Sequence, residues 1–225
     1  EPLECRFPDS GWVEQDAESI WETQRSTIVK VLDQSGIGLS EVSAIGITNQ
    51  RESTIAWNRE TGEALCPAIN WQCRRTAGFC DELKEEGFDE LIRNRTGLVT
   101  DPYFSGTKMH WILQNVPEAA NLARQGKLCF GTVDSWLIWK LSGGTTHAIE
   151  ISNASRTLVF DIQKCEWDSE ILSRFGISPE SLPEVVPSSG VIAEVDESLF
   201  GGSAPIAGAA GDQQAALFGQ ACFSP

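Results

Sequence analysis

The pattern of apolar and polar positions along the chain first predicts a long amphipathic helix. Apolar residues recur at helical spacing from Ile20 through Ile28 to Leu32. Asp16 precedes this run, where a capping side chain belongs, and Gly36 follows it, where a C-terminal glycine belongs. We therefore expect a helix of about five turns between these two residues.

The segment after this helix has the pattern of short strands. β-Branched and apolar residues run over 42–47 and again over 54–57, and a turn is expected at 59–62. A further strand-like piece leads toward Ile69. We interpret the last two runs as a hairpin.

The remainder predicts a helical insert followed by a return to strands. Five helices are expected between glycines and prolines, at 75–86, 88–94, 108–115, 119–125 and 133–141. Beyond them the pattern predicts strands at 148–151, 157–162 and 205–207, and helices at 169–175 and 212–220. Mixed strands and helices with a helical insert are typical of an α/β domain.

Composition narrows the class of protein. The 225 residues are 41% hydrophobic and 22% charged, and no apolar stretch is long enough to cross a bilayer. The N-terminus shows no targeting pattern, so a soluble cytoplasmic protein is expected. A net charge of -15 disfavours binding to nucleic acid.

The residue inventory argues against metal and hydrolase chemistry. Seven cysteines are scattered without a C-x-x-C pair, so we expect reduced thiols, no disulfide framework and no protein-bound metal. His110 and His147 are the only imidazoles, and neither belongs to a recognisable Ser-His-acid arrangement.

Polar residues follow the predicted strand at 42–47 directly and form a candidate diol site. The run Thr48-Asn49-Gln50-Arg51-Glu52 lies where an α/β sheet binds ligands, beyond the carboxyl end of a strand. A guanidinium beside a carboxylate supplies the donors and acceptors that a vicinal diol needs. The alternative for an isolated Arg51-Glu52 pair is an exposed ion pair of little consequence.

Two aromatic residues are candidates for the apolar side of such a site. Trp71, in the run W-Q-C-R-R, can face the carbon skeleton of a polyol, although one Trp among eight is more often core. Tyr103 stands just before a helix that Ser105 or Thr107 can cap. Taken alone, that helix is better explained as a capped core element.

Asp212 is the candidate for acid-base chemistry. It begins a predicted helix after the glycine-rich run 208–211, where backbone and ligand can approach closely. A plain N-cap aspartate is the alternative explanation.

These motifs together resemble the FGGY family of carbohydrate kinases. The run from Tyr103 to Asn115 matches the first signature of that family, and T-N-Q-R-E, W-Q-C-R-R and G-D-Q-Q-A-A-L-F-G are similar to segments of its glycerol kinases. The resemblance implies an α/β, ribonuclease H-like or actin-like ATPase lobe, with a mixed sheet flanked by helices. It also implies ATP-dependent phosphorylation of glycerol to sn-glycerol 3-phosphate, with ATP and Mg²⁺.

The resemblance also implies roles for individual residues, and it indicates which parts of such an enzyme this sequence lacks. It implies Asp212 as the catalytic base, and glycerol binding by Arg51, Glu52, Trp71, Tyr103, Asp212 and Gln213. A D-x-G-T-type phosphate hairpin and a nucleotide lobe are not found. We therefore expect 1–225 to be the substrate-binding lobe, incomplete at its N-terminus with the first hairpin missing, inactive alone, and taken from a homo-oligomeric enzyme that binds ATP mainly elsewhere.

Two questions stay open at this stage. An FGGY kinase for another polyol or a ketose, or a non-catalytic polyol-binding module, would share several of these motifs. The family usually has an aspartate and an aromatic ahead of T-N-A-S-R, whereas this chain has Glu150, Ile151 and Ser152. We interpret 153–157 as sheet and turn structure, without assigning an effect to that departure.

Overall fold

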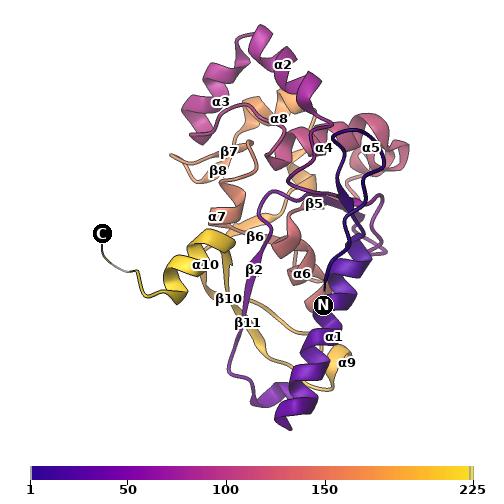
Figure 1. Cartoon of the computed structure of the whole chain (residues 1–225), viewed down its shortest axis with the longest axis vertical. Coiled ribbons are helices and arrows are strands. Elements are labelled where there is room, and N and C mark those ends of the chain that lie inside the picture. Colours follow the sequence, from indigo (N-terminus) through magenta and orange to yellow (C-terminus); the bar gives the residue numbers. More distant parts are fainter. Residues whose placement is uncertain (1, 223, 225) are drawn as a thin grey trace.

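The first helix forms as its capping residues predict. In the computed structural model, which describes residues 2–222 and 224, helix α1 (Ala17–Ser35) begins after Asp16, whose carboxylate accepts a hydrogen bond of 2.9 Å from the Ser19 amide. Gly36 ends it with a φ of 70°. The helix runs along the lower part of the molecule (Figure 1). Its residues Ile20 and Trp21 are buried in the core.

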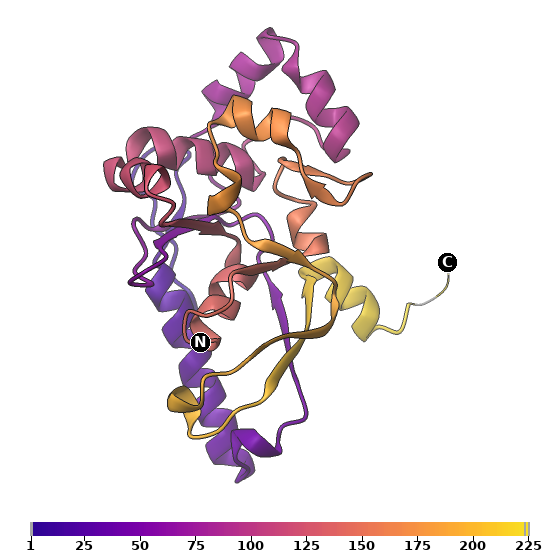
Figure 2. The ribbon, with the colours of Figure 1, turned by 180° about the vertical axis from the view of Figure 1, so that it is seen from behind.

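A three-stranded mixed sheet lies beside α1. Its order is β10 (Ser189–Glu194), β11 (Pro205–Gly211) and β2 (Ile45–Asn49), with β10 and β11 antiparallel and β11 and β2 parallel. Gly211 is paired with Asn49, so the two parallel strands end at the same level. Figure 2 shows β10 and β11 from behind.

The strand boundaries differ from those expected. Strand β2 begins three residues later than predicted, because a short 3-10 turn, η1 (Leu39–Glu41), and its connection come first. Strand β11 extends four residues beyond the expected end, through its glycines and alanines. Strand β10 was missed altogether.

The expected hairpin forms irregularly, and its two strands also pair with more distant segments. Strand β3 (Ile55–Asn58) pairs antiparallel with β5 (Leu128–Gly131), while β1 (Glu14–Gln15) pairs with β4 (Ala68–Ile69). Within the hairpin, backbone hydrogen bonds join Thr54 to Ile69 in both directions, the Leu65 amide to the Ala56 carbonyl and the Asn58 amide to the Glu63 carbonyl. The core position of β3 therefore depends on a partner far along the chain.

The helical insert forms at the predicted place, at the top of Figure 1. Its helices and the one that follows β5 are α2 (Ala77–Glu85), α3 (Phe88–Thr96), α4 (Ser105–Asn115), α5 (Pro117–Arg124) and α6 (Val133–Leu141). Neither Ser105 nor Thr107 caps α4, which corrects our expectation. Ser105 lies inside the helix instead, and its hydroxyl reaches the Glu52 carbonyl at 3.4 Å.

The C-terminal half adds short elements around this frame. They are β6 (Ala148–Glu150), α7 (Ile151–Ala154), β7 (Phe160–Asp161), β8 (Glu166–Trp167), α8 (Ser169–Phe175), η2 (Pro179–Ser181), β9 (Glu184–Val186), α9 (Glu197–Phe200) and α10 (Asp212–Gly219). The interpretation of 153–157 as sheet and turn was wrong in its first part, because Glu150 caps the one-turn helix α7 by accepting from the Asn153 amide.

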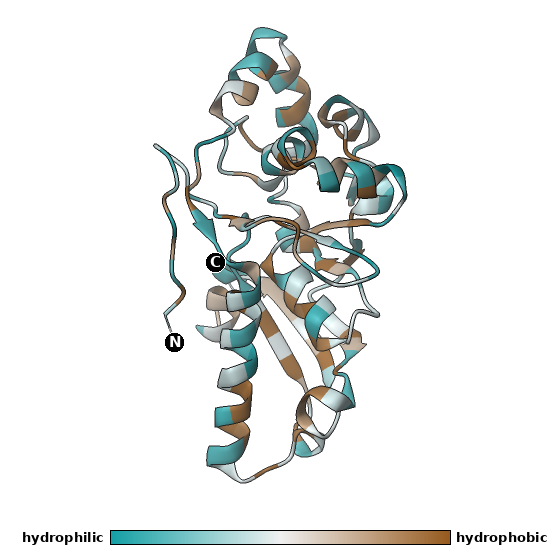
Figure 3. Cartoon of the chain, turned by 90° about the vertical axis from the view of Figure 1, so that its right-hand side faces the viewer, coloured by the Kyte–Doolittle hydropathy of each residue, from teal (hydrophilic) through white to brown (hydrophobic). Residues whose placement is uncertain are grey.

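Two large apolar clusters fill the molecule. One lies between α1, α6 and the mixed sheet and contains Trp57 and Trp136, whose rings are 5.3 Å apart. The other lies among the insert helices around Phe130, Ile112 and Phe175. The apolar faces of α1 and of the strands turn toward each other (Figure 3). No helix in the described part of the chain has the length and apolar character of a membrane span.

Candidate active site

The polar residues singled out in the sequence converge at the carboxyl ends of β2 and β11. Because Asn49 and Gly211 are opposite each other, the segments that follow them leave the sheet side by side. Arg51 Nε lies 2.8 Å from Asp212 Oδ1. A Cβ on Gly211 would come within 2.5 Å of Arg51 Cδ, so glycine is required for this close approach.

Glu52 lies between two guanidinium groups. Its side chain is 3% exposed, and Oε1 accepts a hydrogen bond of 2.7 Å from Arg156 Nε. Arg51 Nε is 3.9 Å from the same oxygen. A buried carboxylate needs such partners, and both cations hold it at the position next to Asp212.

An aromatic wall stands beside these charges. The rings of Trp71 and Tyr103 meet edge-on at 5.6 Å, and Tyr103 meets Phe104 at 5.4 Å. Trp71 remains 37% exposed, so part of its ring is free to meet a ligand. Burial, followed by the charge of Glu52, raises the pKa of the Tyr103 phenol, which therefore stays protonated and able to donate a hydrogen bond.

Lys108 supports this wall from inside α4. Its side chain is fully buried, and Nζ donates to the carbonyl oxygens of Tyr103 and Phe104, the latter at 3.1 Å. Burial lowers the pKa of Lys108 to about 7. The amino group of Lys108 thus fixes the backbone that carries the two rings.

Not every predicted residue joins the cluster, and one residue joins it unpredicted. Gln213 is exposed, and it is Gln214 whose Oε1 lies 3.5 Å from Arg51 Nη1. Arg156 was missed, although it also stacks over Phe104 at 4.9 Å. Its position in the run Ser152-Asn153-Ala154-Ser155-Arg156, which resembles the T-N-A-S-R segment of the family, was the available signal.

The cluster has the chemistry of a polyol site. Glu52 and Asp212 can accept hydrogen bonds from hydroxyl groups, and Arg51 can donate them. The side chain of Asp212 is 50% exposed, so its carboxylate can reach a bound hydroxyl as a proton acceptor. The exposed part of Trp71 offers an apolar surface for a carbon chain.

The cluster offers little to hold a metal ion by itself. Over residues 2–222 and 224 there is no group of three or more His, Cys, Asp or Glu side chains arranged as metal ligands. Asp212 supplies one half-exposed carboxylate. A Mg²⁺ ion at this place would fit best as a partner of phosphate oxygens, which usually provide its ligands together with water.

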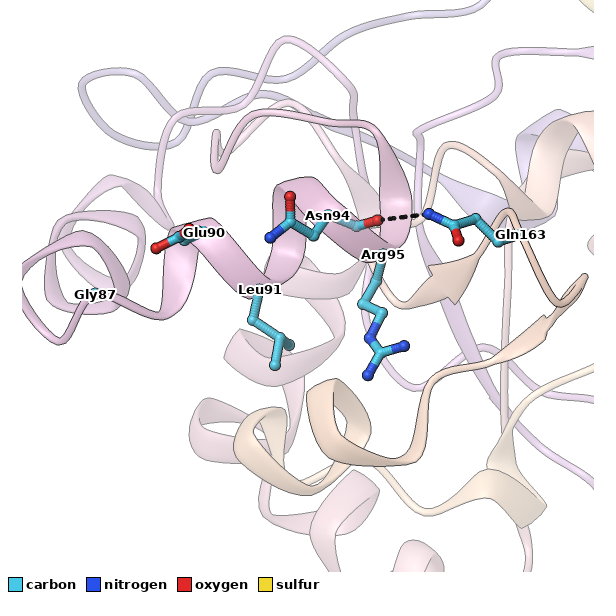
Figure 4. Close-up of a pocket in the computed structure, with 6 residues that line it drawn as sticks. All are labelled: Gly87, Glu90, Leu91, Asn94, Arg95 and Gln163. Atoms are coloured by element: carbon cyan, nitrogen blue, oxygen red, sulfur yellow. Dashed lines mark hydrogen bonds between the residues drawn. The ribbon is translucent and has the colours of Figure 1, made fainter.

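A hollow of about 470 Å³ lies elsewhere, between α3 and the β7–β8 hairpin (Figure 4). Arg95 lines it but lies 3.6 Å from both Asp161 and Asp168. The Gln163 side chain donates to the Asn94 carbonyl at 3.2 Å. These contacts tie the hairpin to α3, so the hollow is explained by packing of the insert.

Comparison with known proteins places this geometry in a family. The family described as "FGGY family of carbohydrate kinases, N-terminal domain" matches residues 1–219. The chain is 57% identical to a glycerol kinase of Treponema denticola and 55% identical to one of Bacillus subtilis, each over 96% of its length. It spans 44% of the length of these curated relatives.

Solved structures agree on the fold. Glycerol kinase of Plasmodium falciparum, crystallised with ADP, is similar over the whole chain with a TM-score of 0.93 and 31% identity, and the match covers 45% of that protein. A xylulose kinase of Lactobacillus acidophilus matches 97% of the chain and 44% of its own length, with a TM-score of 0.82 and 19% identity. The expected fold, an actin-like ATPase lobe with a mixed sheet flanked by helices, is confirmed.

Proposed function

This chain belongs to the FGGY family of carbohydrate kinases, and we propose that the whole protein transfers the γ-phosphoryl group of ATP to glycerol, forming sn-glycerol 3-phosphate. The observation that carries the proposal is the contact of Arg51 with Asp212 and Glu52 beside the Trp71–Tyr103 wall. Identity above 50% to glycerol kinases supports the same substrate.

The residues divide the work between binding and proton transfer. Arg51 and Glu52 hydrogen-bond neighbouring hydroxyl groups of glycerol, while the exposed edge of Trp71 meets its carbon atoms. Asp212 accepts the proton of the hydroxyl whose oxygen attacks the γ-phosphorus. Mg²⁺ bound with ATP neutralises the charge that develops on the phosphoryl oxygens.

Arg51 has a second effect in this arrangement. Its guanidinium lies 2.8 Å from Asp212 Oδ1, and this ion pair draws the carboxylate toward Arg51 before the substrate arrives. Such preorganisation lowers the cost of reaching the reactive geometry. Binding of the diol and placement of the base are thereby coupled through one side chain.

The alternative within the family is a kinase for a larger polyol or a ketose. The same α/β lobe occurs in xylulose kinases, so the fold does not select glycerol. A non-catalytic polyol-binding module would keep Arg51, Glu52 and Trp71 but would have no need of a base at Asp212.

The test is the substrate preference of the whole protein. Purified protein is supplied with ATP and Mg²⁺ and with glycerol, xylulose or gluconate, and the formation of ADP and of the phosphorylated product is followed. We expect glycerol to give the highest kcat/KM. A higher kcat/KM for xylulose or gluconate would show that glycerol is not the preferred substrate. Turnover of none of the three compounds would favour the polyol-binding module.

A further inference from the structure

A buried polar network lies directly beneath the proposed catalytic base. Glu150 and Asp134 are both fully buried at its centre. The Glu150 amide donates to Asp134 Oδ2 at 3.2 Å, and Asn153 Nδ2 donates to the same oxygen at 3.0 Å. Asn49, at the end of β2, donates to Asp134 Oδ1 at 3.0 Å. The network therefore joins the ends of β2 and β6 to helices α6 and α7.

Ser152 connects this network to the backbone next to Asp212. Its hydroxyl donates to Glu150 Oε2 at 2.6 Å and accepts a hydrogen bond of 2.9 Å from the Gly211 amide. Gly211 is the last residue of β11 and the N-cap of α10, and Asp212 follows it directly. The hydroxyl thus holds the residue that presents the Asp212 carboxylate.

The direction of these hydrogen bonds is set by Glu150. Its carboxylate also accepts from the Ser188 hydroxyl at 2.6 Å and from the amide and side chain of Asn153, each at 3.2 Å. A carboxylate held by several donors acts as an acceptor only. The single proton of the Ser152 hydroxyl is therefore given to Glu150, and a lone pair is left for the Gly211 N–H.

Gly211 is also held from its other side. A Cβ on this residue would lie 2.5 Å from Arg51 Cδ, which shows how closely the arginine side chain passes. Gly211 therefore lies between the Ser152 hydroxyl and the Arg51 side chain. The first fixes its amide and the second contacts the Asp212 carboxylate.

We propose that Ser152 is a positioning residue for catalysis. Its hydroxyl, oriented by the Glu150 carboxylate, fixes the Ala210–Gly211 peptide immediately before Asp212, so that Asp212 faces the reacting hydroxyl. The catalytic part of this inference rests on the proposed function. It assigns a role to one of the positions at which this sequence departs from the usual family pattern. Ser152 does not belong to the diol-binding set, so its loss should lower kcat and leave KM for glycerol nearly unchanged.

The experiment compares isosteric variants in the whole protein. Ser152→Thr keeps the hydroxyl, whereas Ser152→Val has the shape of threonine without a hydroxyl. We expect Ser152→Val to lower kcat roughly ten-fold with KM within about two-fold, and Ser152→Thr to keep most of the wild-type kcat. Ser155→Ala is the matched control, because Ser155 lies one turn further on and bonds the Ser152 carbonyl, not Gly211.

A second readout does not depend on activity. Hydrogen exchange of the Gly211 amide reports its bond to Ser152 directly, and it should be faster in Ser152→Val than in the wild type or Ser152→Thr. Thermal midpoints identify any variant that fails to fold, and Ser152→Ala then provides a smaller substitution with the same loss of the hydroxyl.

The outcomes separate this inference from the proposed function. Glycerol turnover in the wild type with an unchanged kcat in Ser152→Val would overturn the positioning role and leave the function standing. Failure of the wild type to phosphorylate any polyol would remove both catalytic claims, and the exchange rate of Gly211 would then still decide whether the contact exists. A rise in KM alone would contradict the inference as well.

Discussion

Glu52 is the most deeply buried charge of the proposed diol site, and the two cations around it explain how it remains there. With 3% of its side chain exposed, the carboxylate would be costly without Arg156 at 2.7 Å and Arg51 at 3.9 Å. The arrangement leaves acceptor capacity on Glu52 for substrate hydroxyls, because each carboxylate oxygen can accept more than one hydrogen bond.

Replacement of Glu52 should therefore weaken glycerol binding more than catalysis. Glu52→Gln keeps the shape but loses the charge-assisted bonds, and we expect KM to rise by an amount equivalent to roughly 1 to 3 kcal/mol, with a smaller change in kcat. Glu86→Gln is the matched control, since Glu86 pairs with Arg174 on the surface at 2.7 Å. The test is steady-state kinetics of both variants in the whole protein. An unchanged KM for glycerol in Glu52→Gln would show that Glu52 does not bind the substrate.

Arg51→Ala should have a broader effect than Glu52→Gln. Arg51 contacts both Glu52 and Asp212, so its loss removes a donor to the diol and the contact that orients the base. We expect KM to rise and kcat to fall together, each measured by initial rates over a range of glycerol concentrations. A change in KM alone would show that Asp212 is oriented without Arg51.

The buried Lys108 side chain leads to a prediction of how the stability of the protein depends on pH. Burial lowers its pKa to about 7 from 10.5, against the charges of Glu52 and Asp101, which act in the opposite direction. Between pH 7 and 10.5 the unfolded chain therefore binds more protons at this position than the native protein does, so stability rises with pH over this window.

The measurement compares the wild type with Lys108→Met, so that other titrating groups cancel. Urea unfolding at pH 7.5, 8.5 and 9.5 gives the difference in unfolding free energy. This difference should shift in favour of the wild type as pH rises, by at most about 1.4 kcal/mol per pH unit. A difference independent of pH would mean that the native ammonium keeps its proton throughout.

At the scale of elements, the fit of α4 against the segment after α7 governs where Tyr103 stands. The Gly106 amide donates to the Thr157 carbonyl at 2.6 Å, and a Cβ on Gly106 would lie 2.7 Å from that oxygen and 2.8 Å from Val159 Cγ1. The helix can approach so closely only because residue 106 has no side chain.

Gly106→Ala should consequently destabilise the protein by roughly 1 to 3 kcal/mol through overpacking. Gly78→Ala provides the control, because Gly78 lies in helix α2 with no atom within 4 Å of the added Cβ, so alanine there should be neutral or stabilising. The thermal unfolding midpoint of each variant is measured and compared with that of the wild type. Equal midpoints would show that α4 shifts without cost.

The elements predicted correctly are those whose signals are local. Helix α1 has its cap at Asp16 and its glycine at Gly36, and α8 and the insert helices lie between clear breakers. Strands β9 and β10 were missed because Pro183 and Pro187 flank them and the start of β10 is exposed to solvent. No local pattern shows whether a strand has its partner in a hairpin or far along the chain.

The residues of the candidate site likewise divide into those that local sequence signals predict and those that they do not. Arg51, Glu52 and Asp212 were predicted because they follow a strand end or a glycine turn in runs that resemble the family. The parallel pairing of β2 and β11 brings them together. Arg156 was missed because its bond to Glu52 joins residues 104 positions apart. Such contacts follow from tertiary packing, which residue spacing alone does not report.

For the whole molecule, the site lies where the two large cores meet. Arg51 and Asp212 come from the end of the mixed sheet, which packs on α1 and α6, whereas Tyr103 and Phe104 come from the helical insert. Arg156 bridges the two parts through Glu52 and the aromatic rings. Under the proposed function, the residues that bind the substrate and the residue that acts as the base therefore come from opposite sides of one cluster.

The central claim is that the whole protein phosphorylates glycerol with Asp212 as the base, and the turnover of Asp212→Asn tests it most directly. Asparagine keeps the shape and can still begin helix α10, but it cannot accept the proton. We predict glycerol turnover in the wild type and a kcat lower by roughly 10² or more in the variant, with the same thermal midpoint. Wild-type turnover of glycerol by Asp212→Asn would contradict the account and leave Asp212 only as the first residue of α10, after its N-cap Gly211.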